Sequence, residues 1–511
     1  MTDAPGSVPV VIVGAGPVGV TAATLLAQYG VECLVLDRWA DVYPQPRAVH
    51  LDDEVARIVG RLGIGKQFAA ISRPARGLQL RDPKMNVLAQ FRRERSETAN
   101  GYPQANMFDQ PEFEALLRAN LKYYPHAVLR GDAEVTAVVQ VGNECAEVTF
   151  ADRVRGRQHR VQAGYVLGCD GANSMVRTAI GASMRDMGFE QRWLVVDVTT
   201  DAELDQWDGV HQVCDPRRAG TFMRVGPSRY RWEFRLLPED TADDFGTVAS
   251  LHPLIRPWVN GVAPQRLQLV RVAEYTFRAQ VADRWRRDNV FLLGDAAHLT
   301  PPFIGQGLCA GLRDAMNLAW KLAGVVHGWL PQGVLDSYER ERKPHARYMI
   351  RFALAMGLTM TAGGETGNLL RRLVLPRLHL IPGIRAKAVD STTPALRSGP
   401  LVIRQGRRRG LAGRLCPNPV LADGKRVDEV VGRRFAVVTS GPLSGQQRAE
   451  LARRGAVAIT AEPGAELDSW LRRAGATTAI VRPDGVVMCA GRDVPELCRL
   501  LPAFAPGFAD A

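Results

Sequence analysis

The sequence contains no Cys-x-x-Cys pair and no long run of apolar residues. Its eight cysteines are scattered, so they have neither the ligand spacing of a zinc site nor the paired thiols of a redox motif, and they suit a reduced cytoplasmic protein. No apolar run approaches the roughly 18 residues of a membrane span. The N-terminus also lacks the basic segment that opens a secretion signal. We therefore expect a soluble cytoplasmic protein with no metal site and no membrane segment.

A concentrated basic patch is also missing, although Lys and Arg outnumber Asp and Glu by 65 to 53 and the net charge is +12. The basic residues are spread along the chain, and the densest run, GRRRG at 406–410, has no interleaved aromatic residues. We therefore expect no nucleic-acid partner. Two explanations of the charge remain: a positive field that attracts anionic substrates and nicotinamide phosphates, or an ordinary solvated basic surface.

The chain is long, and the expected secondary structure changes along it. Its 511 residues exceed one ordinary core, and 46% hydrophobic with 23% charged residues is typical of a globular protein. Strands alternate with helices over 1–185, antiparallel strands follow over 186–288, and long helices appear over 289–362. Residues 363–432 are predicted to be a linker and 433–511 a small domain. The predicted fold class is α/β: a doubly wound, Rossmann-like domain with an inserted antiparallel sheet.

The first motif is a strand that runs into a glycine-rich turn, VVIVGAGPVG. Gly14, Gly16 and Gly19 form G-x-G-x-x-G at the start of a predicted helix, where glycine permits a tight turn, close approach of the backbone to phosphate and close helix packing. The helix N-terminus offers free N–H groups to a pyrophosphate. Asp37 ends the next predicted strand, where an acid suits a ribose 2′-hydroxyl and repels a 2′-phosphate. The pattern predicts a dinucleotide site.

A second motif far downstream, NVFLLGDAAHLTPPFIGQG, again runs an apolar strand into a glycine, Gly294, followed by an acid, Asp295. An amphipathic helix is predicted after Gly307, and a second helical region over 334–360. This second motif suits the other end of the same dinucleotide. A chain that holds one nucleotide at both ends usually keeps it as a prosthetic group, which indicates FAD.

Together with GCDGANSMVR at 168–177, these motifs resemble those of the FAD-dependent aromatic hydroxylases, the single-component flavoprotein monooxygenases. PRAVHLDDE at 46–54 and YERERKPHARYMI at 338–350 look most like the 3-(3-hydroxyphenyl)propionate hydroxylase type. The resemblance covers about 9–350 strongly. It is weaker over 400–500, where the family often carries a thioredoxin-like domain. Because no Cys-x-x-Cys occurs there, we expect that C-terminal domain to serve packing or dimerisation.

The resemblance implies roles for the residues that match the family's motifs. Asp295 would bind the ribityl hydroxyls of the flavin, and segment 301–307 would lie against the flavin ring. Asp170 and Gly171 resemble a motif implicated in FAD and nicotinamide binding, with Arg177 as its structural partner. The cofactor-binding residues so implied, including two that match FAD contacts in relatives (Arg47 and Gln110), are Gly14, Gly16, Gly19, Asp37, Arg47, Gln110, Asp170, Gly171, Gly294, Asp295, Pro302, Gly305, Gln306 and Gly307.

The resemblance also implies the reaction. NADPH or NADH would bind transiently and reduce FAD, and the reduced flavin would take up O₂ as a C4a-hydroperoxide that hydroxylates a phenolic ring. The substrate would be a small aromatic molecule like 3-(3-hydroxyphenyl)propionate. The alternative is a polycyclic aromatic polyketide or antibiotic, modified by a tailoring hydroxylase of the same plan. A homodimer is a family expectation, and Cys309 stands where the family often has Asn.

The sequence leaves the substrate pocket open. A base near the phenol hydroxyl would help the ring to attack. His211, Tyr230 and His298 are candidates, although each is also explained as a structural residue, so no catalytic residue is assigned. The inserted sheet would roof the pocket. Its aromatic residues, which fit a pocket lining or an ordinary half-buried sheet equally well, are Trp193, Phe222, Trp232 and Phe234.

Two other classes of protein fit the sequence less well. A flavin-dependent halogenase shares the FAD fold, but its W-x-W-x-I-P motif is absent from this chain. A non-enzymatic binding or scaffold protein would explain a third domain, yet it would not explain two intact cofactor motifs. Both classes are therefore disfavoured.

Overall fold

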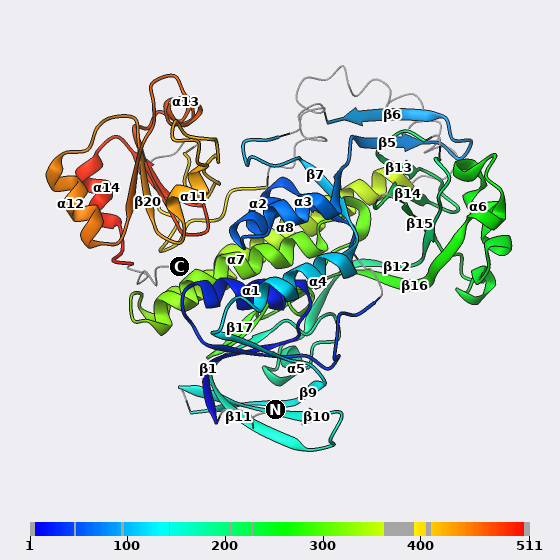
Figure 1. Ribbon diagram of the computed structural model, residues 1–511, viewed down its shortest axis with the longest axis horizontal. Coiled ribbons are helices and arrows are strands. Elements are labelled where there is room, and N and C mark those ends of the chain that lie inside the picture. Colours follow the sequence, from blue (N-terminus) through cyan, green and yellow to red (C-terminus); the bar gives the residue numbers. More distant parts are fainter. Residues whose placement is uncertain are drawn as a thin grey trace.

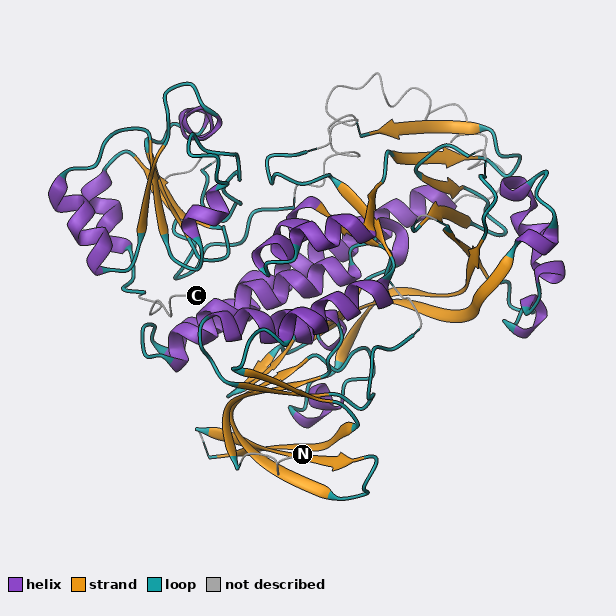
Figure 2. Ribbon diagram, viewed as in Figure 1, coloured by secondary structure: helices purple, strands orange, loops and turns teal. Residues whose placement is uncertain are grey.

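The computed structural model describes residues 6–44, 48–93, 97–142, 144–204, 206–226, 228–361, 393–404 and 410–504. These residues form an α/β protein in which long helices lie at the centre, flanked by two eight-stranded sheets and a smaller C-terminal unit (Figures 1 and 2). The α/β class predicted from the sequence is confirmed. Half of the predicted linker, 363–392 and 405–409, lies outside the described residues.

The first sheet brings the two ends of the nucleotide pattern together. β1 (Ser7–Val13) pairs in parallel with β2 (Cys33–Leu36) and with β11 (Gln158–Gly168). β11 pairs in parallel with β18 (Val290–Leu292), although five strands of the second sheet, β12 to β16, lie between these two strands along the chain. The apolar strands β2 and β18 are buried throughout, as expected of a parallel sheet covered by helices. The remaining strands are β8 (Ala127–Arg130), β9 (Ala133–Val141), β10 (Cys145–Asp152) and β17 (Arg286–Arg287).

The two predicted helical regions are confirmed as α7 (Gly307–Val326) and α8 (Asp336–Thr361). α7 packs against α1 (Pro17–Gln28), and small residues allow the close approach, since a Cβ on Gly311 would lie 2.6 Å from Cγ2 of Val18. The helices that follow the two glycine motifs therefore lie side by side. The other elements of this part are α2 (Asp53–Arg61), α3 (Gly65–Ile71), α4 (Gln110–Leu121), α5 (Met175–Ala179) and the small sheet of β3 (His50–Asp52), β4 (Ser72–Pro74) and β7 (Ala105–Phe108).

The second sheet has the order β19-β16-β12-β15-β14-β13-β5-β6 and is antiparallel except for the β13–β5 pair. Its long strands β12 (Met184–Thr199) and β16 (Gln268–Ala282) fall at the two ends of the strand-rich segment read from the sequence. β5 (Gly77–Arg81) and β6 (Val87–Arg92) join it from within 1–185, a pairing that no local pattern indicates. Its other strands are β13 (Val210–Val213), β14 (Gly220–Arg224), β15 (Arg229–Arg235) and β19 (His298–Leu299).

The two faces of the second sheet differ in chemistry. One face packs against α6 (Val248–Val259), on the side turned away from the central helices (Figure 1). Along β15 the residues on that face are Tyr230, Trp232 and Phe234. Because side chains alternate along a strand, Arg231 and Glu233 lie on the opposite face, toward the part of the protein that contains the first sheet and the central helices.

The C-terminal unit is a four-stranded sheet of order β21-β20-β22-β23 with helices beside it. Its hydrophobic residues belong to the same core as those around the first sheet. The rings of Phe435 and Phe504 meet the Trp320 ring of α7 edge to face, with centroids 5.5 Å and 5.9 Å from that of Trp320, respectively. The elements of the unit are α11 (Val427–Val431), β20 (Ala436–Thr439), α12 (Gly445–Arg453), β21 (Val457–Thr460), α13 (Glu466–Arg473), β22 (Thr478–Val481), β23 (Val487–Gly491) and α14 (Val494–Leu500).

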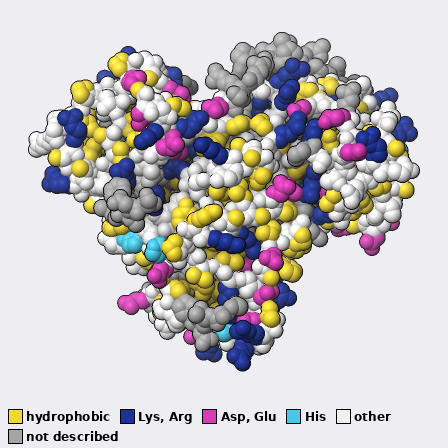
Figure 3. Space-filling model, viewed as in Figure 1, with side chains coloured by type: hydrophobic (Ala, Val, Ile, Leu, Met, Phe, Trp, Pro, Cys, Tyr) yellow, Lys and Arg dark blue, Asp and Glu magenta, His cyan; other side chains and the backbone are white. Residues whose placement is uncertain are grey.

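The surface shows basic and acidic side chains mingled on the face seen in Figure 3. Among the described residues, no helix has the length and apolar character needed to cross a membrane. Within the same ranges, no group of three or more His, Cys, Asp or Glu side chains could hold a metal ion.

Candidate active site

The candidate site lies at the carboxyl ends of β1, β11 and β18, which are neighbours in one parallel sheet. Val13 is in register with Gly168, and Gly168 with Leu292, so the chain leaves all three strands at one edge. Gly14 follows the first strand, Asp170 comes shortly after the second and Gly294 shortly after the third. Crevices at the carboxyl ends of parallel strands are where nucleotides bind in open α/β sheets.

The three glycines of the first motif have different structural roles. Gly14 has a φ of +101°, and a Cβ there would lie 2.5 Å from the carbonyl oxygen of Cys169. A Cβ on Gly19 would lie 2.0 Å from the carbonyl oxygen of Gly14. Gly16, in contrast, is the N-cap of α1, makes no side-chain cap and has open space where a Cβ would stand. The structure thus presents a free helix N-terminus with room for the phosphates of a dinucleotide.

Asp37 follows β2 and is only 8% exposed. Its carboxylate accepts from the backbone N–H of Ala15 at 2.5 Å and from that of Trp39 at 2.8 Å. It therefore holds the glycine turn in place. A carboxylate has further lone pairs, so this position also fits a ribose hydroxyl.

Asp170 and Gly171 form a turn after β11. Asp170 accepts from the Ser174 hydroxyl at 2.5 Å and from the Val176 N–H at 3.0 Å, and Gly171 has a φ of +81° with open space beside it. Burial raises the pKa of the Asp170 carboxyl. Arg177 donates to the carbonyl oxygen of Ala296 at 3.1 Å, which ties this turn to the Gly294–Asp295 turn.

Gly294 and Asp295 lie in a one-turn 3-10 helix, Gly294–Ala296, where Gly294 has a φ of +59°. The Gly294 N–H donates to Asp314 of α7 at 3.1 Å, and Nε2 of His298 bonds the same carboxylate at 2.7 Å. His298 is fully buried in this contact, so it anchors the turn and is not available to a substrate. Asp295 is half-buried beside it.

The segment predicted to lie against the flavin ring forms a short 3-10 helix, Pro302–Ile304, and then the start of α7. Gly305 has a φ of +61°, and a Cβ on it would lie 3.0 Å from Nδ1 of His50. α7 begins at Gly307, where no side chain caps it and a Cβ would stand in open space. A second uncapped helix N-terminus is therefore presented at the site, with a positive dipole end that suits a reduced, anionic ring.

The Gln306 side chain points into the protein. Its amide donates to Asp52 at 2.9 Å, and its oxygen accepts from Arg313 at 3.0 Å. Arg313 also donates to Asp52 at 2.6 Å. Burial alone would raise the pKa of the Asp52 carboxyl, but Arg313 holds it below its usual value. Asp52 and Arg313 were missed at the sequence level, and only their contact with Gln306 shows that they support this segment.

The other two predicted contacts lie near β3. Oε1 of Gln110 accepts from the Ala48 N–H at 2.6 Å, and Nε2 of Gln110 donates to Glu114 at 2.6 Å, so Gln110 holds the backbone just before β3. Arg47 itself lies outside the described residues. The Cys309 thiol is buried and faces backbone carbonyls, including that of His50 at 3.7 Å.

The remaining candidate bases belong to the α6 face of the second sheet. Nδ1 of His211 accepts from Trp258 Nε1 at 3.1 Å, and Nε2 of His211 bonds the Trp207 carbonyl oxygen at 3.0 Å, so both ring nitrogens are used. Burial lowers the pKa of His211 to about 4. Tyr230 is buried in the same core. Of the four aromatic residues considered for a pocket lining, Phe222, Trp232 and Phe234 pack in this core, and only Trp193 lies on the other face.

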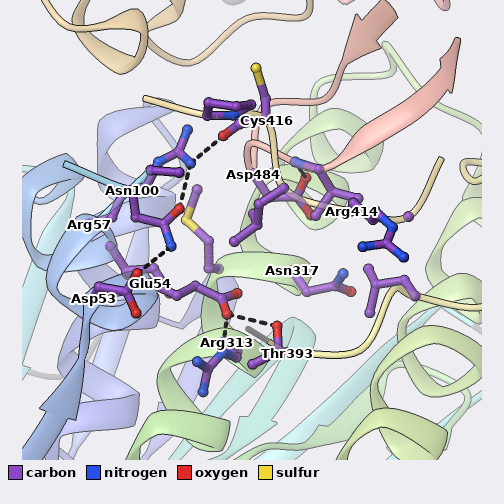
Figure 4. Close-up of a pocket in the computed structure, with 18 of the residues that line it drawn as sticks. Asp53, Glu54, Arg57, Asn100, Arg313, Asn317, Thr393, Arg414, Cys416 and Asp484 are labelled. Carbon is purple, nitrogen blue, oxygen red and sulfur yellow. Dashed lines mark hydrogen bonds and ion pairs between the residues drawn. The ribbon is translucent and has the colours of Figure 1, made fainter. Parts of the chain in front are cut away.

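A separate cavity of about 320 Å³ lies between α2 and α7 on one side and the C-terminal unit on the other (Figure 4). α2 contributes Arg57 and Glu54, and the C-terminal unit contributes Cys416 and Asp484. Its charged side chains have partners within the protein: Arg57 donates to the backbone carbonyl oxygen of Cys416 at 2.6 Å, and Arg313 forms an ion pair with Glu54 at 2.8 Å. The cavity therefore belongs to the interface between these two parts of the protein.

Comparison with known proteins agrees with this geometry. Residues 7–353 match the family described as FAD binding domain. The chain is 35% identical over 437 residues to 3-(3-hydroxy-phenyl)propionate/3-hydroxycinnamic acid hydroxylase 2 of Burkholderia vietnamiensis, covering 84% of this chain and 78% of that protein. It is 32% identical over 522 residues to a probable NADH-specific resorcinol 4-hydroxylase of Rhodococcus jostii, covering 97% of this chain and 94% of that one.

Among solved structures, a ternary complex of aklavinone-11 hydroxylase with FAD and aklavinone has the same fold, with a TM-score of 0.80, 22% identity and coverage of 99% of this chain and 100% of that one. The chain therefore belongs to the FAD-binding-domain family of flavoprotein monooxygenases. Within it, the chain is an FAD-dependent aromatic hydroxylase that uses a nicotinamide nucleotide as electron donor.

Proposed function

We propose that this hydroxylase acts on a single-ring phenol with a meta substituent, of the 3-(3-hydroxyphenyl)propionate kind. The observation that carries the proposal is the relationship to two hydroxylases of such phenols, each at least 32% identical over 84% or more of this chain. A second candidate is resorcinol, because the resorcinol 4-hydroxylase matches 97% of the chain, including the C-terminal unit. A polycyclic substrate is less favoured, since the protein that acts on one is only 22% identical.

We assign the cofactor contacts as follows. The N-terminus of α1 at Gly16 faces the pyrophosphate, and Asp37 binds the ribose of the adenosine half. Asp295 accepts from the ribityl hydroxyls, because a carboxylate is a strong acceptor for several O–H donors. The N-terminus of α7 at Gly307 approaches the ring. The open space at Gly16 and Gly307 supports these assignments. So does the hydrogen bond from Arg177, which connects the turn at Asp170 to the turn at Asp295.

The protein's share of the reaction is binding, orientation and exclusion of water. When bound, FAD supplies the redox chemistry, taking electrons from NADH or NADPH and activating O₂. The Gln306, Asp52 and Arg313 network keeps the ring-facing segment rigid. The second sheet closes over that segment, since the Trp193 and Phe303 rings meet edge to face with centroids 6.1 Å apart. We infer that the substrate pocket lies under this contact.

Three further assignments belong to the same proposal. The C-terminal unit is taken to be a thioredoxin-like domain that serves packing. A homodimer stays a prediction. A cytoplasmic location is supported by all eight cysteines being free thiols.

The test is NADH and NADPH oxidation by the purified yellow protein, with and without each phenol, together with the mass of the product. We expect strong stimulation by 3-(3-hydroxyphenyl)propionate or resorcinol and a product heavier by one oxygen atom. A protein that oxidises NADH at the same rate with either phenol, and leaves both unchanged, contradicts the proposal.

A further inference from the structure

The second sheet presents a row of charged side chains toward the flavin-binding part. Asp197 of β12, Arg231 of β15 and Arg271 of β16 are opposite one another in register, so they share one face of the sheet. Arg231 donates to both oxygens of Asp197, at 2.7 and 2.9 Å, and both residues are at most 1% exposed. Their charges are therefore satisfied within the sheet.

Glu233 continues this row and differs from its neighbours. It lies two residues along β15 from Arg231, opposite Val195 on one side and Thr221 on the other. Its nearest ion-pair partner is Nη1 of Arg231 at 4.0 Å, which is too long for a hydrogen bond. Among the residues that the structure describes, no donor is recorded for the Glu233 carboxylate. Within the described ranges, the Glu233 carboxylate thus has no protein donor, and a donor on a ligand would complete its hydrogen bonds.

The position of Glu233 is fixed by contacts at both ends of the face. Toward one end, Trp193 of β12 packs against Phe303 of the segment that faces the flavin ring. Toward the other end, Arg229 of β15 forms an ion pair with Asp109, the residue just before α4. Glu233 therefore lies between the ring-facing segment and the start of α4, on the sheet face that covers the site.

The Glu233 side chain can also be reached. It is 12% exposed, while the side chain of Arg231 is 1% exposed and that of Asp197 is fully buried. A partly accessible carboxylate beside an Arg231–Asp197 pair that is already satisfied is free to accept from a ligand. The hydroxyl of a phenol would supply the missing donor, and would become more reactive by giving up its proton.

We propose that Glu233 is the hydrogen-bond acceptor and general base for the substrate's phenol hydroxyl. This role rests on the proposed function. The phenol O–H bond breaks, its electron pair stays on the phenol oxygen, and the proton forms an O–H bond with the Glu233 carboxylate. The phenolate directs electron density into the ring, where one atom of O₂ would be added as a hydroxyl group while the other leaves as water, with the two electrons coming from NADH or NADPH. The ring carbon that takes up the hydroxyl group then loses its hydrogen as a proton, which restores the aromatic ring. The proton returns from Glu233 to the phenolate oxygen of the product.

The groups around Glu233 determine its pKa, and so the direction in which kcat/KM changes with pH. Burial raises the pKa of its carboxyl, Arg231 lowers it and Asp197 raises it, and the outcome is a pKa above that of an ordinary glutamate. The other charged or titratable groups on this face are Arg271 and Tyr275 of β16, Arg235 of β15, whose guanidinium donates to the Arg217 carbonyl oxygen, and Arg229 of β15 with its partner Asp109. A base must be ionised to act, so kcat/KM falls as the pH falls through this raised pKa.

The experiment compares Glu233→Gln and Glu233→Asp with the wild-type protein, using kcat/KM against pH for 3-(3-hydroxyphenyl)propionate and resorcinol. We expect Glu233→Gln to retain FAD, to lose kcat/KM by about a hundredfold or more, and to lose the acid limb of the profile. Glu233→Asp should keep the acid limb at reduced activity. The matched control is Glu274→Gln on the same sheet, where an exposed carboxylate pairs with Arg192 and the profile should be unchanged.

The outcomes separate the role from the function. Wild-type protein that hydroxylates neither phenol refutes the proposed function and this role with it. An active wild-type protein with an unchanged profile in Glu233→Gln refutes the role of Glu233 alone. If Glu233→Gln fails to fold, Glu233→Asp provides the test. An active Glu233→Asp variant whose pH profile has lost the acid limb overturns the proposal, and an active Glu233→Asp variant whose profile keeps the acid limb supports it.

Discussion

Arg482 of the C-terminal unit donates to both carboxylate oxygens of Glu341 on α8, at 2.9 and 3.0 Å. Glu341 also accepts from Lys321 and Asn317 of α7, at 2.9 and 2.8 Å. All four residues are at most 3% exposed. The C-terminal unit is thus joined to the flavin-binding part through a buried ionic network as well as through shared hydrophobic core.

Glu341 makes the stability of this junction depend on pH. Burial would raise its pKa, but Arg482 and Lys321 lower it from 4.5 to about 2. Between these values the unfolded chain binds a proton that the folded protein does not, so the contribution is complete above about pH 4.5 and is lost as the pH falls toward 2. We expect a smaller loss of unfolding free energy with acid in Glu341→Gln, measured by urea unfolding, than in wild type. Glu462→Gln, which changes an exposed carboxylate, is the control. The assignment would be contradicted if the unfolding free energy fell with pH at the same rate in all three proteins.

Asp428 makes a second ionic contact across the same junction. It lies 2.6 Å from Arg57 and 2.5 Å from Arg61, and the side chains of all three are at most 10% exposed. Asp428→Asn leaves two arginines buried without a full charge partner, which costs about 3–5 kcal/mol. We expect the loss in thermal or urea unfolding, with flavin reduction by NADH unchanged in the folded protein. Exposed Asp423→Asn should unfold like wild type, and a stable Asp428→Asn variant would show that the contact adds little.

The glycine turn offers a matched pair of substitutions. Gly19→Ala places a methyl group 2.0 Å from the Gly14 carbonyl oxygen, so it should disrupt the turn and reduce folded protein. Gly16→Ala meets no protein atom within 4 Å, so the apoprotein should fold normally. Its methyl group would occupy the space assigned to the pyrophosphate, and we expect FAD affinity to fall at least about tenfold. Circular dichroism and flavin fluorescence titration separate the two effects, and wild-type FAD affinity in Gly16→Ala would place the phosphates elsewhere.

Asp295→Ala tests the assignment to the ribityl chain. Loss of an ionised acceptor should cost about 1.5–3 kcal/mol per hydrogen bond. We expect weaker FAD retention, read as flavin released on dilution or gel filtration, with the secondary structure retained. Glu190→Ala, an exposed carboxylate on the second sheet, is the control. Full flavin occupancy with wild-type affinity in Asp295→Ala would exclude the assignment.

The sequence by itself determined the local elements of the cofactor site. Gly14, Gly16 and Gly19 after a β-branched strand specify a strand, a tight turn and a helix, because each choice depends on residues a few positions apart. The long helices α7 and α8 follow from apolar periodicity in the same way. Similarity in sequence to known proteins then showed the family, since the family model matches residues 7–353.

Only the tertiary structure decided which side chains face the site. Alternation along β15 shows that Trp232 and Glu233 lie on opposite faces, but not that α6 covers the aromatic face. The network of Gln306 with Asp52 and Arg313, the pairing of β5 with β13 and the contact of Arg482 with Glu341 join segments far apart in the chain. Such contacts depend on the packing of whole elements, and a sequence pattern read over a few residues holds no information on them.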